Sequence, residues 1–499
     1  MESKEAGLRI GAGATATATA CGVCAALLVL SGCGGAQGGR EPEAPGKTGA
    51  VSSPAQSRPV PRGDGSDVGS DLNGDGHPDL VLGEDLHAGT RLSVAYGSEK
   101  GLDPSTHTVI GPGGLQLGET GQAADLDGDG YSDIPVAAAP GQAMNALATP
   151  HIVWGGPKGP QSGRTPVKVP LPEGFEAGYE ELSPTTGDFN GDGHPDLALN
   201  GPNVAVLYGP FSRDGRPDEK AVPQARTDIE GGASIVADPA ASAARDSPGG
   251  KRATGLVVLG RGGDGEQVPA TYIPGGPGGL REDEYPLSAG NAAAFGDFNG
   301  DGRRDIAVAD SGSRNNEAPG SGSAARPDAV AVHYGTEGGG VDGKEKRLTS
   351  PAGTGGVGGR VLAVDTDGDG ADELAALGYP ATEGETQADK VLVFDGGRQG
   401  LRPDGARTLR RLSPAKTAGR ELPAGERLAS PEAARDLDGD GREELLLSFA
   451  GPGYEGSQVW VTDGHDDQQA FSTAKCSQEK QCQREVYDYK MSDVEAGFK

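Results

Sequence analysis

Residues 436–447 of this chain read DLDGDGREELLL. In this stretch carboxylates stand at positions 1, 3, 5 and 9, glycines at positions 4 and 6, and three leucines follow. Glycine permits a tight bend, because it adopts backbone conformations that other residues avoid. Apolar residues directly after a glycine-containing loop predict a β-strand. The stretch therefore predicts an acidic loop that leads into a strand.

The same pattern, Asp-x-Asp/Asn-Gly-Asp-Gly-x-x-Asp/Glu, occurs six times along the 499 residues. Successive copies are 54, 63, 109, 68 and 71 residues apart. The interval of 109 residues is about two repeats long, and residues 234–238 within it resemble a strand that no acidic loop follows. We therefore expect seven units, of which the fourth is degenerate. The six copies begin at Asp71, Asp125, Asp188, Asp297, Asp365 and Asp436.

Each unit carries further strand signals. A second apolar run follows each loop, as at residues 94–97 and 206–209, and residues 270–273 supply one for the fourth unit. With 87 Gly and 37 Pro, the chain is not mainly helical. A single unit of about four strands cannot bury both of its faces, whereas a closed ring of units can. The sequence predicts an all-β, seven-bladed β-propeller over residues 67–499. Residues from about 466 to 499 either form a C-terminal tail or complete the seventh blade.

The units resemble FG-GAP repeats, the blades of the integrin α-subunit propeller and of many bacterial surface proteins. The motif survives in part as Phe295-Gly296, directly before the acidic loop that begins at Asp297, and as Gly378-Tyr379-Pro380. The resemblance implies that protein ligands dock on the face opposite the acidic loops, where residues 310–327 and 379–389 are candidates. It also implies that strands from the two chain ends close the ring, with the segment near Val68 completing the last blade.

The loops have the chemistry of calcium ligands. Ca²⁺ prefers hard oxygen donors, and clustered carboxylates repel one another without a cation. We expect side chains at positions 1, 3, 5 and 9 and the backbone carbonyl at position 7 to bind up to six Ca²⁺ ions, in calcium-binding loops of six blades. An EF-hand is excluded, because position 12 is apolar in all six loops. The alternative is a set of Asp-Gly turns that hold no ion. The predicted ligands are Asp71, Asn73, Asp75, His77, Asp79, Asp125, Asp127, Asp129, Tyr131, Asp133, Asp188, Asn190, Asp192, His194, Asp196, Asp297, Asn299, Asp301, Arg303, Asp305, Asp365, Asp367, Asp369, Ala371, Glu373, Asp436, Asp438, Asp440, Arg442 and Glu444.

The N-terminus predicts export and anchoring. Residues 1–32 have the short charged start and apolar stretch of a signal peptide. They end in Leu30-Ser31-Gly32-Cys33, which resembles the lipobox of bacterial lipoproteins, in which the cysteine is lipidated. The alternative is an ordinary secretory signal with a chance cysteine. We expect a membrane anchor at Cys33, a flexible tether over 33–66, and a location on the extracellular face of the bacterial cell membrane.

Two further cysteines, Cys476 and Cys482, remain for the exported chain. Cysteines so close together in an exported protein favour a disulfide, although both thiols could also stay free.

The net charge and the absence of catalytic motifs in the sequence disfavour several classes of function. The net charge of −29 disfavours a nucleic-acid partner, which requires a basic surface. No nucleophile elbow, zinc-protease motif or phosphate-binding loop is present, so we expect no enzyme activity. We expect a monomeric binding or adhesion module for an unknown extracellular protein or glycan. The alternative is a carbohydrate-binding or carbohydrate-active propeller, a lyase or hydrolase. That class would expose aromatic rings, whereas Trp154 and Trp460 both fall in strand runs.

Overall fold

The computed structural model describes residues 59–84, 91–111, 113–140, 147–161, 164–173, 175, 182–201, 204–218, 224–226, 232–239, 253–260, 267–312, 327–381, 387–413, 416–417, 420–421, 424–449 and 457–472. The predicted signal peptide, the lipidated Cys33, most of the tether, and Cys476 with Cys482 lie outside these residues. Most of the predicted docking stretches, namely residues 313–326 and 382–386, lie outside them as well. Within the described part of the chain, no helix has the length and hydropathy needed to cross a membrane.

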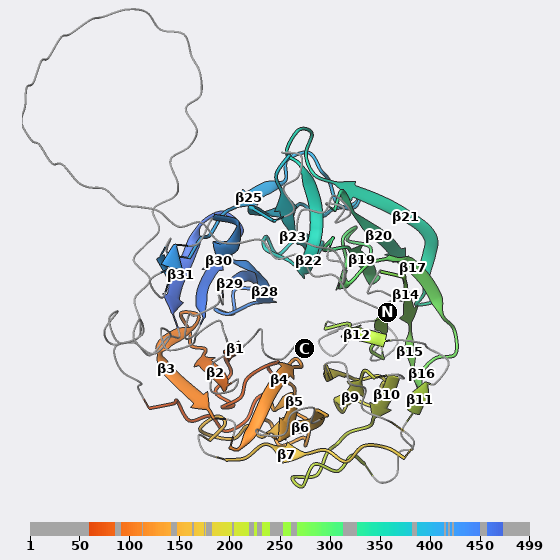
Figure 1. The fold of residues 1–499 in the computed structure, drawn as a ribbon. Coiled ribbons are helices and arrows are strands. Elements are labelled where there is room, and N and C mark those ends of the chain that lie inside the picture. The colour runs from red at the N-terminus through yellow and green to blue at the C-terminus, as the bar shows by residue number, and fades with distance from the viewer. Residues whose placement is uncertain are drawn as a thin grey trace, which may run out of the picture. The chain divides into compact units, whose positions relative to one another are not determined.

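In the described residues, seven antiparallel sheets of three or four strands follow one another around a ring (Figure 1). The predicted all-β, seven-bladed propeller is thus confirmed. The first blade contains β1 (Leu80–Glu84), β2 (Arg91–Tyr96) and β3 (Asp103–Ile110). The second contains β4 (Leu115–Thr120), β5 (Ile134–Pro140), β6 (Thr149–Val153) and β7 (Val167–Lys168). The third contains β8 (Thr185–Gly187), β9 (Asp196–Leu199), β10 (Val204–Leu207) and β11 (Gln224–Arg226).

The fourth blade has the strand content of its neighbours although it lacks an acidic loop. It contains β12 (Gly232–Ala237), β13 (Leu256–Gly260), β14 (Pro269–Ile273) and β17 (Tyr285–Ala289). The fifth contains β18 (Ala292–Gly296), β19 (Asp305–Ala309), β20 (Ala329–Gly335) and β21 (Val341–Thr349). The sixth contains β22 (Gly356–Val364), β23 (Glu373–Tyr379), β24 (Lys390–Phe394) and β25 (Arg407–Leu409). The seventh contains β28 (Ser430–Arg435), β29 (Glu444–Phe449), β30 (Gln458–Thr462) and β31 (Asp467–Ser472).

Short elements connect some of these strands. The pair β15 (Gly275–Gly276) and β16 (Gly279–Leu280) forms a small hairpin within the fourth blade. Between the sixth and seventh blades lie β26 (Lys416–Thr417), β27 (Arg420–Glu421) and the 3₁₀ helix η2 (Ala424–Arg427).

The hydrophobic core is divided among the interfaces between blades. The described residues form seven buried clusters, and each cluster joins two consecutive blades. Side chains alternate between the two faces of a strand. In β9, Leu197 and Leu199 accordingly pack toward the second blade, while Ala198 packs toward the fourth. Both faces of the strand that follows each loop are therefore buried, which explains the continuous apolar run after each loop.

The ring closes differently from the expectation that the Val68 segment completes the last blade. The last blade has its own outer strand, because β31 pairs with β30 within the range predicted to be a tail. Leu80 and Leu82 of the first blade pack against Leu446 and Phe471 of the last. The segment near Val68 instead lies at the first blade, where the Asp79 amide donates to the Ser70 carbonyl at 2.9 Å. Apolar packing between the first and last blades therefore closes the ring.

The end of the predicted tether is packed against the acidic loops. The Gly63 amide donates to the Asn73 carbonyl at 3.2 Å, and the Ser66 amide donates to the Gly130 carbonyl at 2.8 Å. The Ser66 hydroxyl also donates to Asp71 Oδ2 at 2.6 Å. Residues 59–66 therefore cover the first two loops, in contrast to the predicted flexible segment.

Candidate metal centres

All six acidic loops occupy the same place in their blades. The six loops lead directly into strands β1, β5, β9, β19, β23 and β29. The loops therefore gather on one face of the ring. Their glycines at positions 4 and 6 all have positive φ, between 65° and 94°. This conformation costs other residues about 1–2 kcal/mol. The glycines predicted to permit the bend are thus required by the backbone.

The carboxylates at positions 1 and 9 are held by backbone amides. In every loop the amide at position 6 donates to the position 1 carboxylate, at 2.7–3.1 Å. In every loop the amide at position 2 donates to the position 9 carboxylate, at 2.8–3.0 Å. These bonds fix two acidic side chains across the loop.

A second anchor of position 9 was not anticipated from the sequence. In four loops the other oxygen of the position 9 aspartate accepts a second hydrogen bond, at 2.8–2.9 Å. The donor is the amide of a glycine at or just after the end of β2, β6, β10 or β20. The signal in the sequence is an aromatic residue followed by glycine, which we interpreted only as the end of a strand run. The four glycines are Gly97, Gly155, Gly209 and Gly335.

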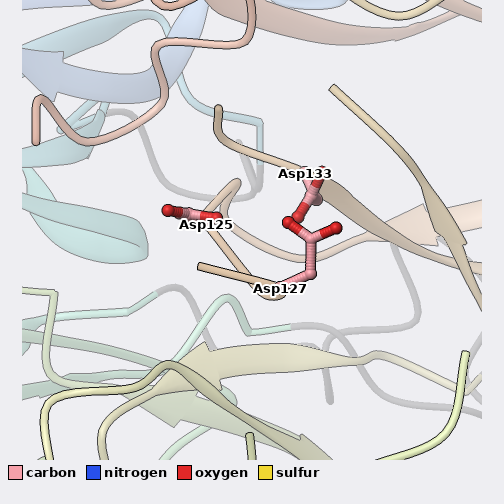
Figure 2. Close-up of side chains that lie close together, drawn as sticks. All are labelled: Asp125, Asp127 and Asp133. Carbon is pink, nitrogen blue, oxygen red and sulfur yellow. The ribbon is translucent and has the colours of Figure 1, made fainter. Parts of the chain in front are cut away.

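Three loops bring their carboxylates at positions 1, 3 and 9 together. Among the described residues, three acidic groups have ligand oxygens within 4.8 Å of one another. Figure 2 shows the group in the second loop, where Asp127 and Asp133 approach each other and Asp125 lies across the loop. The three groups are Asp125, Asp127 and Asp133; Asp365, Asp367 and Glu373; and Asp436, Asp438 and Glu444.

The other three loops carry asparagine at position 3, so they offer one amide oxygen in place of a carboxylate. Asn73, Asn190 and Asn299 are these residues. The carboxylate at position 5 points back to its own loop in all six copies and accepts the position 7 amide at 2.8–3.3 Å. The structure therefore groups positions 1, 3 and 9 most closely, and leaves the position 5 carboxylate engaged with the backbone.

The donor set fits a hard divalent cation. Asp127 Oδ1 and Asp188 Oδ1 are buried and have no hydrogen-bond partner among the described residues. An unpartnered buried carboxylate oxygen is costly, and a cation would satisfy it. Oxygen-only ligands with several carboxylates match the preference of Ca²⁺.

Burial makes the ionised form of the position 9 carboxyls unfavourable. It raises the pKa of Asp133 and of Asp196 to about 8. It also raises the pKa of Glu444 to about 7, where the carboxylates of the same loop add to the effect. The positive charge of a bound cation would offset this cost of burial.

The second loop is contacted by an arginine from the next blade. Arg213 lies in the turn between β10 and β11, and its guanidinium forms ion pairs with Asp127 and Asp129, at positions 3 and 5. The guanidinium carbon also lies 4.9 Å from the centre of the Trp154 ring. A weaker contact occurs in the fifth loop, where Arg407 Nη2 lies 3.7 Å from Glu373 Oε2.

In the fourth blade an ion pair stands where the other blades have an acidic loop. Asp238 follows β12, and its carboxylate accepts both bonds from Arg304 Nε, at 3.0 and 3.2 Å. Arg304 belongs to the loop of the fifth blade and also contacts Asp372. Asp238, an acidic side chain that the degenerate unit places at this position, is therefore neutralised by a residue of the protein itself.

A cavity of about 600 Å³ lies between the inner ends of the blades. Its lining combines small and apolar residues with charged ones, among them Arg304, Asp372, Arg435 and Glu443 from the fifth to seventh blades. Asp372 and Glu443, at position 8 of their loops, accept the position 1 amide of the preceding loop, at 2.5 and 3.1 Å. The lining residues therefore also connect neighbouring loops.

Comparisons with known proteins agree with this architecture. Residues 71–136 match the model of an FG-GAP-like repeat, and residues 289–325 match that of the FG-GAP repeat. The two segments contain the first, second and fourth acidic loops.

Similar solved structures are distant. A fucose-specific lectin from Aleuria aurantia, described as a six-bladed β-propeller, is 10% identical, with a TM-score of 0.32 over 80% of this chain and 96% of the lectin. The Synechocystis apocarotenoid oxygenase is 10% identical, with a TM-score of 0.41 over 84% of this chain and 93% of the oxygenase. With TM-scores this low, neither protein bears on function. The chain is therefore a ring of seven sheets that contains segments similar to FG-GAP repeats.

Proposed function

We propose that this protein is a calcium-stabilised binding module, anchored by lipid to the outer face of a bacterial cell membrane. One observation carries the calcium part of the proposal. Six loops repeat a single geometry in which backbone amides hold the carboxylates at positions 1 and 9 on one face of the ring. Such repeated ordering of like charges is expected where a cation completes each site.

The anchoring part of the proposal rests on the sequence Leu30-Ser31-Gly32-Cys33. A diacylglycerol on the cysteine supplies the two acyl chains that stable anchoring requires. Cys33→Ser should release the protein from the cell envelope, and labelling with a radioactive fatty acid should mark the wild type alone. Equal labelling of both proteins would contradict the anchor.

Calcium stoichiometry tests the metal sites directly. Equilibrium dialysis of the full chain against millimolar Ca²⁺ should give up to six ions per molecule, and Asp436→Asn should remove one. Asp463→Asn is a matched control, because Asp463 also accepts backbone amides in a tight turn but belongs to none of the six loops. A wild type that binds no Ca²⁺ at millimolar concentration would refute calcium binding.

The binding role requires a partner on or outside the cell. Chemical crosslinking on intact cells should join the wild type to a surface protein in the presence of Ca²⁺ and not in EDTA. The carbohydrate alternative receives no support from the tryptophans, because Trp460 is 3% exposed and Trp154 is stacked with Arg213. Binding to a glycan array, with no crosslinked protein, would favour that alternative.

A further inference from the structure

The turn that carries Arg213 is fixed against the second loop. The Phe211 amide donates to the carbonyl of Leu126, at position 2 of that loop, at 2.7 Å. Phe211 itself is buried in the cluster between the second and third blades. Two more backbone bonds, at 2.8 and 2.7 Å, close the turn over residues 212–216. The backbone therefore positions Arg213 beside the loop.

Other loops receive the same backbone contact without a side chain. The carbonyls of Leu72, Phe189 and Phe298, each at position 2 of a loop, accept amides at 3.1–3.3 Å. Their donors are glycines, Gly156, Gly276 and Gly397, which bring no charge to the loop. The turn of the third blade differs from these turns in presenting a guanidinium to its neighbour.

The guanidinium neutralises carboxylates that a bound cation would otherwise neutralise. Asp127 and Asp129 are both paired with Arg213, whose side chain is 47% exposed, while the side chain of Asp127 is only 7% exposed. Asp127 is also one of the three carboxylates that converge in the second loop (Figure 2). A calcium ion and a guanidinium on the same carboxylate would repel each other, so the two compete.

We propose that Arg213 is an internal competitor for Ca²⁺ in the second loop, which makes this loop the weakest calcium site of the six and couples its occupation to the release of Arg213 from Trp154. This inference rests on the proposed calcium binding and extends it to the order in which the sites fill. At low calcium Arg213 neutralises the loop. At high calcium the ion replaces it, and the side chain leaves the indole ring.

Calcium titration of the full chain by calorimetry tests the order of filling. In Arg213→Ala and Arg213→Gln, the weakest site should tighten by roughly tenfold, as expected when a competing charge in direct contact is removed. Arg216→Ala is the matched control, because Arg216 lies in the same turn and pairs with Asp214 rather than with the loop. Adding Asp127→Asn to Arg213→Ala should abolish the gain.

Tryptophan emission supplies a second readout. In the wild type, emission should change over the calcium range in which the weakest site fills, and the change should be absent in Trp154→Phe and in Arg213→Ala. If the wild type binds Ca²⁺ but both Arg213 variants give the same isotherm, the competition is refuted while calcium binding stands. If neither the wild type nor the variants bind Ca²⁺, the proposed calcium function fails first.

Discussion

The fourth blade differs from the other six blades in how its buried carboxylate is neutralised. All have paired antiparallel strands and apolar interfaces, so the sheet does not depend on the acidic loop. In the fourth blade Asp238 is paired with Arg304, a residue of the protein itself. In three of the other blades three carboxylates converge. Two buried carboxylate oxygens of the acidic loops, Asp127 Oδ1 and Asp188 Oδ1, have no hydrogen-bond partner within the described chain. The comparison indicates that the strands build the ring without the acidic loops, whereas the proposed cations would neutralise those loops.

Removal of calcium should have the largest effect on this contrast. A site at 100-fold saturation adds about 2.7 kcal/mol to the free energy of unfolding, so two such sites contribute roughly 5 kcal/mol. Thermal unfolding followed by circular dichroism should therefore show a melting temperature several degrees lower in EDTA than in millimolar Ca²⁺. Unfolding curves that coincide in the two conditions would remove the distinction between the fourth blade and the others.

Loss of the fourth-blade ion pair should be the next largest effect. Arg304→Ala leaves the carboxylate of Asp238, which is 5% exposed, without its strongest partner. Breaking a buried pair in this way costs about 3 kcal/mol or more. Denaturant unfolding should show this loss equally in Ca²⁺ and in EDTA.

The adjacent residue supplies the control for that experiment. Arg303→Ala removes only the exposed pair with Asp301 and should change stability by less than about 1 kcal/mol. A loss for Arg304→Ala that appears only in the presence of Ca²⁺ would show that the pair serves a metal site instead.

Glycine substitutions separate loop geometry from sheet geometry with a smaller effect. Gly441, at position 6 of the last loop, has φ of 87° and space around a β-carbon. Gly441→Ala should therefore cost about 1–2 kcal/mol through backbone strain alone. Gly278, in the fourth blade, has equal space and no positive φ, so Gly278→Ala should change stability by less than about 0.5 kcal/mol. Equal losses in denaturant unfolding would contradict the strained loop.

A buried histidine predicts the smallest effect, which depends on pH. The Ser288 amide donates to His333 Nε2 at 3.2 Å, so that nitrogen is unprotonated. Burial lowers the pKa of His333, although Glu345 and Asp342 act in the opposite direction. The unfolded chain therefore takes up this proton first as the pH falls below about 6.5, and stability is lost in that range.

The difference between the wild type and His333→Gln isolates this group from the carboxyls. The stability advantage of the wild type should shrink between pH 7.5 and pH 5, as measured by denaturant unfolding at each pH. An advantage that stays constant with pH would show that His333 titrates alike in the folded and unfolded chains.

Much of the fold was predictable because its signals are local and repeated. The acidic loop, the glycines at positions 4 and 6 and the strand that follows lie within 12 consecutive residues, as at 436–447. The interval of 109 residues also located the degenerate blade correctly, since β12 and β14 cover the runs at 234–238 and 270–273 apart from Asp238. Ring closure was not predictable, because strand β31 has weak sequence signals and is defined by its pairing with β30.

The sequence by itself determined the seven units, the apolar strands after the loops and the carboxylate positions of each loop, because each depends on neighbouring residues in a repeated pattern. Only the tertiary structure decided which charges meet. Arg213 reaches Asp129 across 84 residues, and Arg304 reaches Asp238 across 66. Such contacts depend on the packing of one blade against the next, and no spacing within a single repeat encodes them.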